Sequence, residues 1–308
     1  MKCFLHIGTE KTATKTIQSF FYENRKELLS NGVSYAQTVG RKNHRLLPLA
    51  AYDLSRRDDS TMRLRISSDK QLKVHQEDIL EKLNCEMMVG RRENQTVVFS
   101  SEHIQSRLTK LSELRRLKEI LLEVGITDIK VIVYLRRPSD IASSLFSTVL
   151  KNGRQISEPP PPNHPYWNNI CNHRATLERY GMVFGEDSVI PRLFEVDSFH
   201  QGSIIKDILS VMSIPINSSY KFPSNKNERL SVRSIRILSV FNERMPQYFF
   251  GRPNPFRPLL VRFLIRFFKD EKYKMSDALY EQYEQEFEHS NEWVRARYFS
   301  DKKNLFTK

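Results

Sequence analysis

The chain has 308 residues, of which 39% are apolar, and it carries a formal net charge of +13. This length and apolar content are enough for one large α/β domain or for two small ones. The positive charge favours an anionic ligand or surface, such as a nucleotide, nucleic acid, anionic lipid or acidic glycan.

The cysteines and the lack of long apolar runs favour a cytoplasmic protein. Cys3, Cys85 and Cys171 have neither paired nor metal-ligand spacing, which is typical of a reducing compartment. The apolar run after Met1-Lys2 is too short for a signal peptide. No run approaches the roughly 20 apolar residues that span a bilayer. We therefore expect neither an export signal nor a membrane span.

The segment from Cys3 to Gln18, CFLHIGTEKTATKTIQ, predicts a strand, a tight loop and the start of a helix. This order directs backbone N–H groups and a helix N-terminus at an anion. Lys11 and Lys15 add positive charge, and the threonines of the loop add hydroxyl donors. The alternative interpretation is an ordinary turn with solvated lysines. The loop is not a nucleotide-triphosphate loop, because Thr9 and Thr14 stand where that motif requires glycine.

The next segments predict a helix over 16–30 and a short strand over 33–36. His44 follows in a basic, polar stretch. A surface or capping role is the more common one for such a histidine, and a role on the substrate side is the alternative.

A buried strand is predicted over 96–99, followed directly by Ser100-Ser101-Glu102-His103 at the start of a helix. Ligands of open parallel sheets gather outside the carboxyl ends of the strands. Glu102 and His103 are therefore expected at the same edge as the Lys11 loop. The alternative for Glu102 is a carboxylate that complements the helix dipole.

The clearest buried strand is predicted over 130–135, and it ends at Arg136-Arg137-Pro138 before another helix. Ser144 lies eight residues after Arg136, about two helical turns along. An Arg at the strand end and a Ser on the helix can both reach one phosphate. Alternatively, Ser144 is a small packing residue and Arg136 pairs with an acid.

Together, these two segments resemble the donor-binding segments of sulfotransferases. Glu10-Lys11-Thr12-Ala13-Thr14-Lys15-Thr16 resembles the loop that holds the 5′-phosphosulfate, and Arg136 to Ser144 resembles the segment that holds the 3′-phosphate. The opening His6-Ile7-Gly8 is similar to that of bacterial-type carbohydrate sulfotransferase-like proteins. Two departures stand out, since Ala13 replaces a usual Gly and Lys15 replaces a usual hydroxyl residue.

The resemblance implies a single α/β domain over 1–308, with a P-loop kinase-like parallel sheet, helical insertions and a helical C-terminal region. It implies sulfuryl transfer from 3′-phosphoadenosine 5′-phosphosulfate (PAPS) to a hydroxyl or amine of a carbohydrate or glycoconjugate. Lys11 would stabilise the leaving group and Glu102 would be the base, with His103 the alternate. The donor would be bound by Lys11, Thr12, Ala13, Thr14, Lys15, Thr16, Arg136 and Ser144.

We expect no metal, because these residues require none, and no nucleic-acid partner, because the chain has no nucleic-acid motif. Two rival functions are an ATP-dependent small-molecule or sugar kinase and a non-catalytic polyanion-binding protein. The missing Walker glycines and the extra segment at Arg136 argue against the kinase. The scattered basic residues and the lack of a nucleic-acid motif argue against the binder.

The remaining segments carry structural predictions. Residues 157–165, with four consecutive prolines, predict a rigid extended loop. Pro191 predicts an edge position for a last strand over 188–194. The segment 258–269, PLLVRFLIRFFK, predicts an amphipathic helix with a basic stripe. That helix is either buried against the core or docked peripherally on the inner face of a membrane.

Overall fold

The computed structural model describes residues 1–93, 95–223, 230–245, 248–249, 252–268, 271 and 273–307. Its contacts divide the chain into two compact units. Unit 1 comprises 1–136, 173–224 and 293–308, and unit 2 comprises 137–172 and 225–292. The sequence prediction of one domain over 1–308 stays a prediction, because a compact unit is not by itself an independently folding domain.

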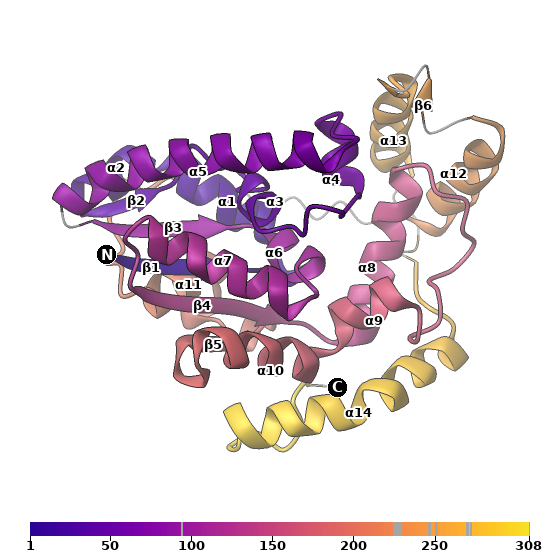
Figure 1. The fold of residues 1–308 in the computed structure, drawn as a ribbon. Coiled ribbons are helices and arrows are strands. Elements are labelled where there is room, and N and C mark those ends of the chain that lie inside the picture. The colour runs from indigo at the N-terminus through magenta and orange to yellow at the C-terminus, as the bar shows by residue number, and fades with distance from the viewer. Residues whose placement is uncertain are drawn as a thin grey trace. The chain divides into compact units, whose positions relative to one another are not determined.

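Unit 1 is built on a five-stranded sheet in the order β2-β3-β1-β4-β5, and every strand pairing in it is parallel (Figure 1). The strands are β1 Lys2–His6, β2 Val33–Tyr35, β3 Thr96–Ser100, β4 Asp128–Leu135 and β5 Val189–Leu193. The order places β1 at the centre and β5 at an edge. The edge position predicted from Pro191 is therefore confirmed.

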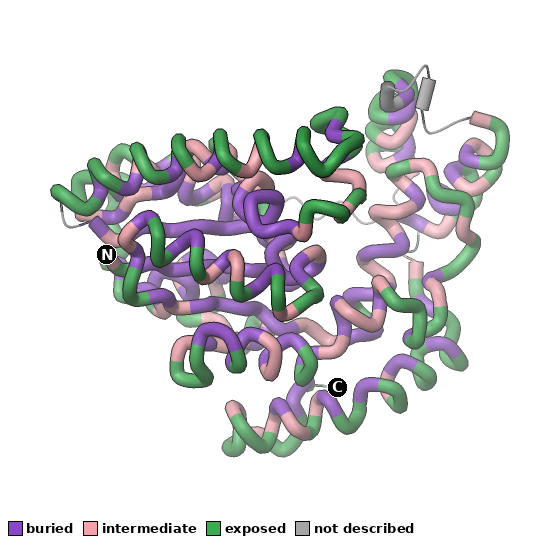
Figure 2. Tube along the Cα trace, in the orientation of Figure 1, coloured by how far each residue is buried: buried purple, intermediate pink, exposed green. Residues whose placement is uncertain are grey.

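Alternating side chains of the strands divide the core of unit 1 into two layers. Cys3, Leu5, Val97, Phe99, Val131 and Val133 lie in one cluster, with residues of α3, α5, α6, α7 and α10. Phe4, Val98, Ile132 and Tyr134 lie in the other cluster, with residues of α1, α2 and α11. The inner strands β1, β3 and β4 are thus buried on both faces, and the strand traces are mostly coloured as buried in Figure 2. This burial explains their nearly continuous apolar sequence.

The α-helices of unit 1 cover these two layers. They are α1 Thr14–Glu23, α2 Arg25–Ser30, α3 Leu46–Ala50, α4 Asp59–Arg63, α5 Asp69–Arg92, α6 Glu102–Arg107, α7 Leu111–Glu123, α10 His173–Phe184 and α11 Ile204–Val211. Short 3-10 turns lie at η1 Glu186–Ser188, η2 Val196–Ser198 and η3 His200–Gly202.

The single helix predicted over 16–30 is wrong, because the helix breaks at Asn24. The Asn24 side chain donates to the Phe20 carbonyl at 2.9 Å and pairs with both backbone groups of Lys221. Such side-chain bonds compete with the helical ladder. The chain therefore forms α1 and α2 instead of one helix.

Unit 2 is mainly helical and has its own apolar core. Its elements are α8 Pro138–Lys151, α9 Pro165–Cys171, α12 Val232–Arg244, α13 Phe256–Phe267 and the short strands β6 Tyr248–Phe249 and β7 Arg252–Pro253. The helix α14, Asp277–Tyr298, contains the boundary between the units. A parallel sheet flanked by helices, with helical insertions and a helical C-terminal region, confirms the predicted fold class.

Candidate functional site

The loops after β1, β3 and β4 gather predicted site residues at the carboxyl edge of the sheet. β1 and β4 are neighbours, but the chain leaves β1 toward β2 on one side and leaves β4 toward β5 on the other. This reversal is a topological switch point, where open parallel sheets bind ligands. The residues that follow β1 and β4 are therefore the first place to look for a site.

The loop after β1 is fixed by its own backbone and hydroxyls. The Thr9 amide donates to the Tyr134 carbonyl at 3.1 Å, which ties the loop to β4. The buried hydroxyls of Thr12 and Thr14 donate to the Thr9 carbonyl at 2.7 and 3.4 Å. Lys11 has a φ of 68°, in the left-handed region. The predicted threonine donors thus shape the loop in this structure.

Helix α1 begins at this loop without a side-chain cap. Its N-cap residue is Ala13, with φ 55° and ψ 26°, and its first turn contains no acidic residue. Uncapped first-turn amides and the positive end of the helix dipole favour a bound anion. Thr16 is half-buried and Lys15 is exposed at this helix end. The strand, the loop and the start of the helix therefore follow one another as predicted, and anion binding by this loop stays a prediction.

Arg136 links the end of β4 to this loop. Its Nη1 donates to the Lys11 carbonyl at 2.9 Å, and its guanidinium lies 5.4 Å from the ring centre of Phe194. Its own carbonyl is 2.7 Å from Nε2 of the buried His173. Burial lowers the pKa of His173 to about 4, so the ring is neutral at pH 7 and donates through Nε2–H. Arg136 is therefore held by groups on both sides.

Glu102 lies beside the same loop, at the end of β3. A Cβ atom added to Gly8 would stand only 3.2 Å from Cα of Glu102, and Gly8 has a φ of 101°, which side chains disfavour, so glycine suits this close approach. The Glu102 carboxylate accepts from Nε2 of Gln18 at 3.0 Å and from Nδ2 of Asn43 at 3.4 Å. Two amide side chains thus orient a half-buried carboxylate.

His103 is buried next to Glu102, and its Nδ1 has no hydrogen-bond partner among the described residues. Its pKa is lowered to about 4, first by burial and then by the positive charge of Arg45. The ring is neutral at pH 7 and is a weak base compared with an ordinary histidine. Of the two bases named from sequence, Glu102 has the better-defined hydrogen-bond environment.

His44 lies in the interior, where it supports the edge of β3. The side chain is fully buried, and its Nδ1 accepts from the Ser100 amide at 2.9 Å. Burial lowers its pKa to about 3. On the other side of Ser100, the hydroxyl lies 2.8 Å from Nδ1 of His6, whose pKa burial also lowers to about 3. This placement gives His44 a structural task and lends no support to its predicted substrate role.

Ser144 belongs to unit 2 and is half-buried on α8. The first turn of that helix is occupied by α14, since Ser139 donates to Glu284 at 2.9 Å and Arg137 donates to the Tyr280 hydroxyl at 2.6 Å. The prediction that Ser144 and Arg136 share one phosphate stays a prediction.

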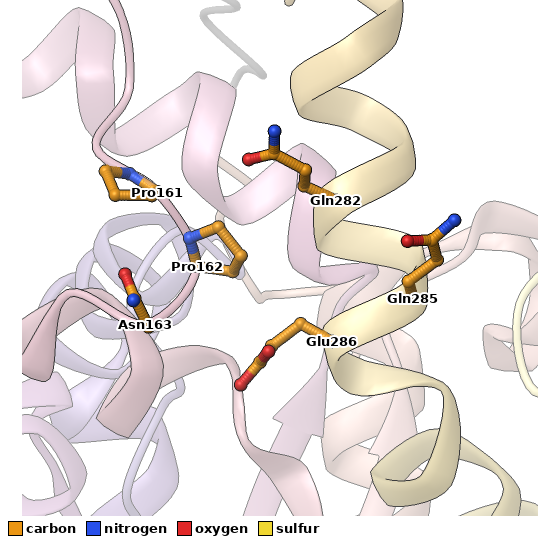
Figure 3. Close-up of a pocket in the computed structure, with 6 residues that line it drawn as sticks. All are labelled: Pro161, Pro162, Asn163, Gln282, Gln285 and Glu286. Carbon is orange, nitrogen blue, oxygen red and sulfur yellow. The ribbon is translucent and has the colours of Figure 1, made fainter.

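A shallow hollow of about 380 Å³ lies within unit 2 (Figure 3). Pro161, Pro162 and Asn163 of the predicted rigid loop form one side, and Gln282, Gln285 and Glu286 of α14 form the other. The Tyr283 hydroxyl fixes the loop by donating to the Pro160 carbonyl at 2.7 Å. None of these six lining residues is basic and Glu286 is acidic, so the hollow lacks the positive charge that favours a phosphate.

Sequence reasoning missed Gln18, Asn43, Phe194 and His173 at the sheet edge. The only sequence signal for Gln18 is its polar character beside Ile17 on the buried face of α1. The other three residues reach the edge through tertiary contacts, which no local pattern predicts. Among the described residues, no group of three or more His, Cys, Asp and Glu could hold a metal ion.

No protein-family model matches the chain, and no curated protein matches its sequence. Among solved structures, the chain is similar to the crystal structure of a sulfotransferase from Alicyclobacillus acidocaldarius. The two are 14% identical, with 96% of this chain and 95% of that chain covered and a TM-score of 0.46. A likeness this distant carries no argument about activity, so the function has to be inferred from the residues of the site.

Proposed function

We propose that the protein is a PAPS-dependent sulfotransferase that acts on a hydroxyl or amine of a carbohydrate or glycoconjugate. One observation carries this proposal. The Arg136 guanidinium donates to the Lys11 carbonyl, so the two segments that resemble donor-binding segments meet at the switch point of the sheet. Because β1 and β4 are neighbouring parallel strands, their loops share one edge of the sheet, and this hydrogen bond ties the two segments together there.

The donor would lie across the ends of β1 and β4. The loop Lys11-Thr12-Ala13 and the first turn of α1 would hold the 5′-phosphosulfate by backbone amides and by the Lys11 charge. Arg136 would hold the 3′-phosphate together with Ser144, as the resemblance implies. A guanidinium is suited to this task because it presents several donors to one phosphate.

In the reaction, the acceptor oxygen or nitrogen attacks the sulfur in line with the bond to the leaving nucleotide. The new bond to sulfur forms as the bond to the bridging oxygen breaks, and 3′-phosphoadenosine 5′-phosphate leaves. Lys11 and the loop amides would stabilise the negative charge that develops on that oxygen. Glu102, oriented by Gln18 and Asn43, would take the acceptor's proton.

The carbohydrate acceptor comes from the sequence resemblance, and we propose a mechanism without a metal because the residues named above require none. A cytoplasmic location is proposed as well. It is supported by Cys3, Cys85 and Cys171, all of which have free thiols.

The Lys11→Ala variant distinguishes a sulfotransferase from a protein that only binds polyanions. We expect its affinity for 3′-phosphoadenosine 5′-phosphate, measured by calorimetry, to fall about ten- to hundredfold through loss of a charge-assisted contact. Retention on a heparin column should stay unchanged. Lys26→Ala removes an exposed lysine of α2 and serves as the control.

A polyanion binder would behave differently. It would bind no nucleotide in any variant, and its heparin retention would fall equally with either lysine. That pair of results would contradict the sulfotransferase.

A further inference from the structure

Helix α13 exposes a row of large apolar side chains. Phe256 is 58% exposed, Leu259 62%, Phe263 51% and Phe267 63%. At 100° per residue these four, here called the α13 stripe, fall within about 80° of the helix circumference. The rings of Phe263 and Phe267 lie 4.4 Å apart. Isolated exposed apolar residues are common, but an aligned row of four marks an interaction site.

The α13 stripe is distinct from the face by which α13 packs into unit 2. On another side of the helix, Leu264 is 1% exposed in the core of unit 2, and Leu260, Val261 and Ile265 pack there as well. The buried Arg257 anchors the first turn by donating to the Leu150 carbonyl at 3.2 Å and to the Asn242 side chain at 2.5 Å. The helix is therefore held in place with its stripe facing outward.

Charge indicates what the stripe contacts. The segment from Phe256 to Phe267 has no Asp or Glu, and it carries exposed Arg262 and Arg266 beside Leu259 on the helix surface. Aromatic and aliphatic residues next to arginines are typical of helices that lie in the interface of an anionic bilayer. A symmetric contact with a second copy of the chain would instead bring like charges together.

The length of α13 limits how it could meet a bilayer. Twelve helical residues extend about 18 Å, against a hydrocarbon core of about 30 Å. More generally, no helix in the described part of the chain has the length and hydropathy of a membrane-spanning segment. The helix can lie on a bilayer, but it cannot cross one.

We propose that α13 docks the protein peripherally on an anionic lipid surface. The α13 stripe enters the acyl region, while Arg262 and Arg266 pair with lipid phosphates. This contact depends on neither donor binding nor catalysis, so it stands or falls separately from the sulfotransferase function. It would bring the enzyme to acceptors that are attached to lipid.

Vesicle sedimentation of the full chain tests the proposal. One set of vesicles is pure phosphatidylcholine, and the other contains one part in four of phosphatidylglycerol. We expect the wild type to bind the anionic vesicles at least about tenfold more tightly. Arg262→Gln with Arg266→Gln should weaken that binding about thirtyfold and remove the preference for anionic lipid. Phe263→Ser with Phe267→Ser should weaken binding to the anionic vesicles at least about tenfold.

Met62→Ser with Met182→Ser is the matched control, since these side chains are 71% and 73% exposed on α4 and α10. This control should bind like the wild type, and thermal melts should show that every variant is folded. Failure of the wild type to bind anionic vesicles would overturn the proposal, and so would unchanged binding in the phenylalanine pair. Self-association that the phenylalanine pair abolishes, without vesicle binding, would assign the stripe to a second copy of the chain instead.

Discussion

The carboxyl edge of the sheet and the α13 stripe depart from ordinary burial in opposite directions. At the sheet edge, polar groups are buried: His6, His44 and Gln18 are all at most 2% exposed. On α13, apolar groups are exposed, and each of the four side chains of the stripe is more than half accessible. Both departures cost stability unless something compensates for them.

The compensation differs between the two regions. The buried polar groups find partners inside unit 1, as when Gln18 bonds to Glu102 and His44 accepts from Ser100. The exposed apolar groups of the α13 stripe are not covered within the described chain, and the lipid surface that we propose would cover them. In our proposals, the buried polar network holds a site that is organised before the donor binds, whereas the exposed apolar row is covered only when the protein binds a membrane.

The largest effect we expect is that acid destabilises the buried polar groups of unit 1. Four buried histidines of unit 1 have lowered pKa values, at about 3 for His6 and His44 and about 4 for His103 and His173. Their unfolded values are near 6.5, so the unfolded chain binds more protons between pH 6.5 and pH 4. Stability is therefore full above pH 6.5 and falls as the pH drops.

We expect the free energy of unfolding to fall by about 5 kcal/mol between pH 7 and pH 5.5. At pH 5.5, the chain should take up roughly 3.5 protons when it unfolds. Urea unfolding at the two pH values measures the first quantity, and calorimetry in buffers of different ionisation enthalpy measures the second. An uptake below about one proton would show that these rings are not held neutral by burial.

We expect a smaller effect on stability from a substitution in the loop after β1. Ala13 has a left-handed backbone, which an alanine adopts at a cost and a glycine adopts freely. We expect Ala13→Gly to raise the free energy of unfolding by about 0.5–1 kcal/mol, measured by urea unfolding.

Ala296→Gly is the control for this substitution. Ala296 is exposed on α14, where the same change should lower the free energy of unfolding by a similar amount. Loss of stability in both variants would contradict the left-handed conformation at Ala13.

Local patterns predicted the elements of unit 1 well. The strands at β1, β3 and β4 are apolar runs bounded by turn signals, and the loops that end them carry the residues of the predicted site. Because parallel strands share one carboxyl edge, the sequence also predicted that Glu102 and the Lys11 loop lie together. Gly8, packed against Glu102, makes that approach possible.

Tertiary contacts decided what the sequence could not predict. The break at Asn24 depends on Lys221, which is distant in the chain, and the buried His44 is paired with Ser100, which is also distant in the chain. The sequence left two interpretations of the 258–269 helix open, burial against the core and peripheral membrane docking. The structure buries one face of α13 and exposes the α13 stripe, and membrane docking stays a proposal. Lys269 lies outside the described residues, so the predicted basic stripe is seen only at Arg262 and Arg266.

The most direct test of the central claim is the affinity for 3′-phosphoadenosine 5′-phosphate, measured by calorimetry against ADP and AMP. Arg136→Ala is the variant, and Arg115→Ala, which removes an exposed arginine of α7, is the control. A charge-assisted contact contributes about 1.5–3 kcal/mol, so the loss of Arg136 should weaken binding roughly ten- to hundredfold. The control should bind like the wild type.

We expect tight binding of the nucleotide that carries a 3′-phosphate, weak binding of ADP and AMP, and loss of this difference in Arg136→Ala. Equal affinity for ADP would favour a kinase. No affinity for any of the three nucleotides would leave a polyanion binder, and either result would contradict the sulfotransferase.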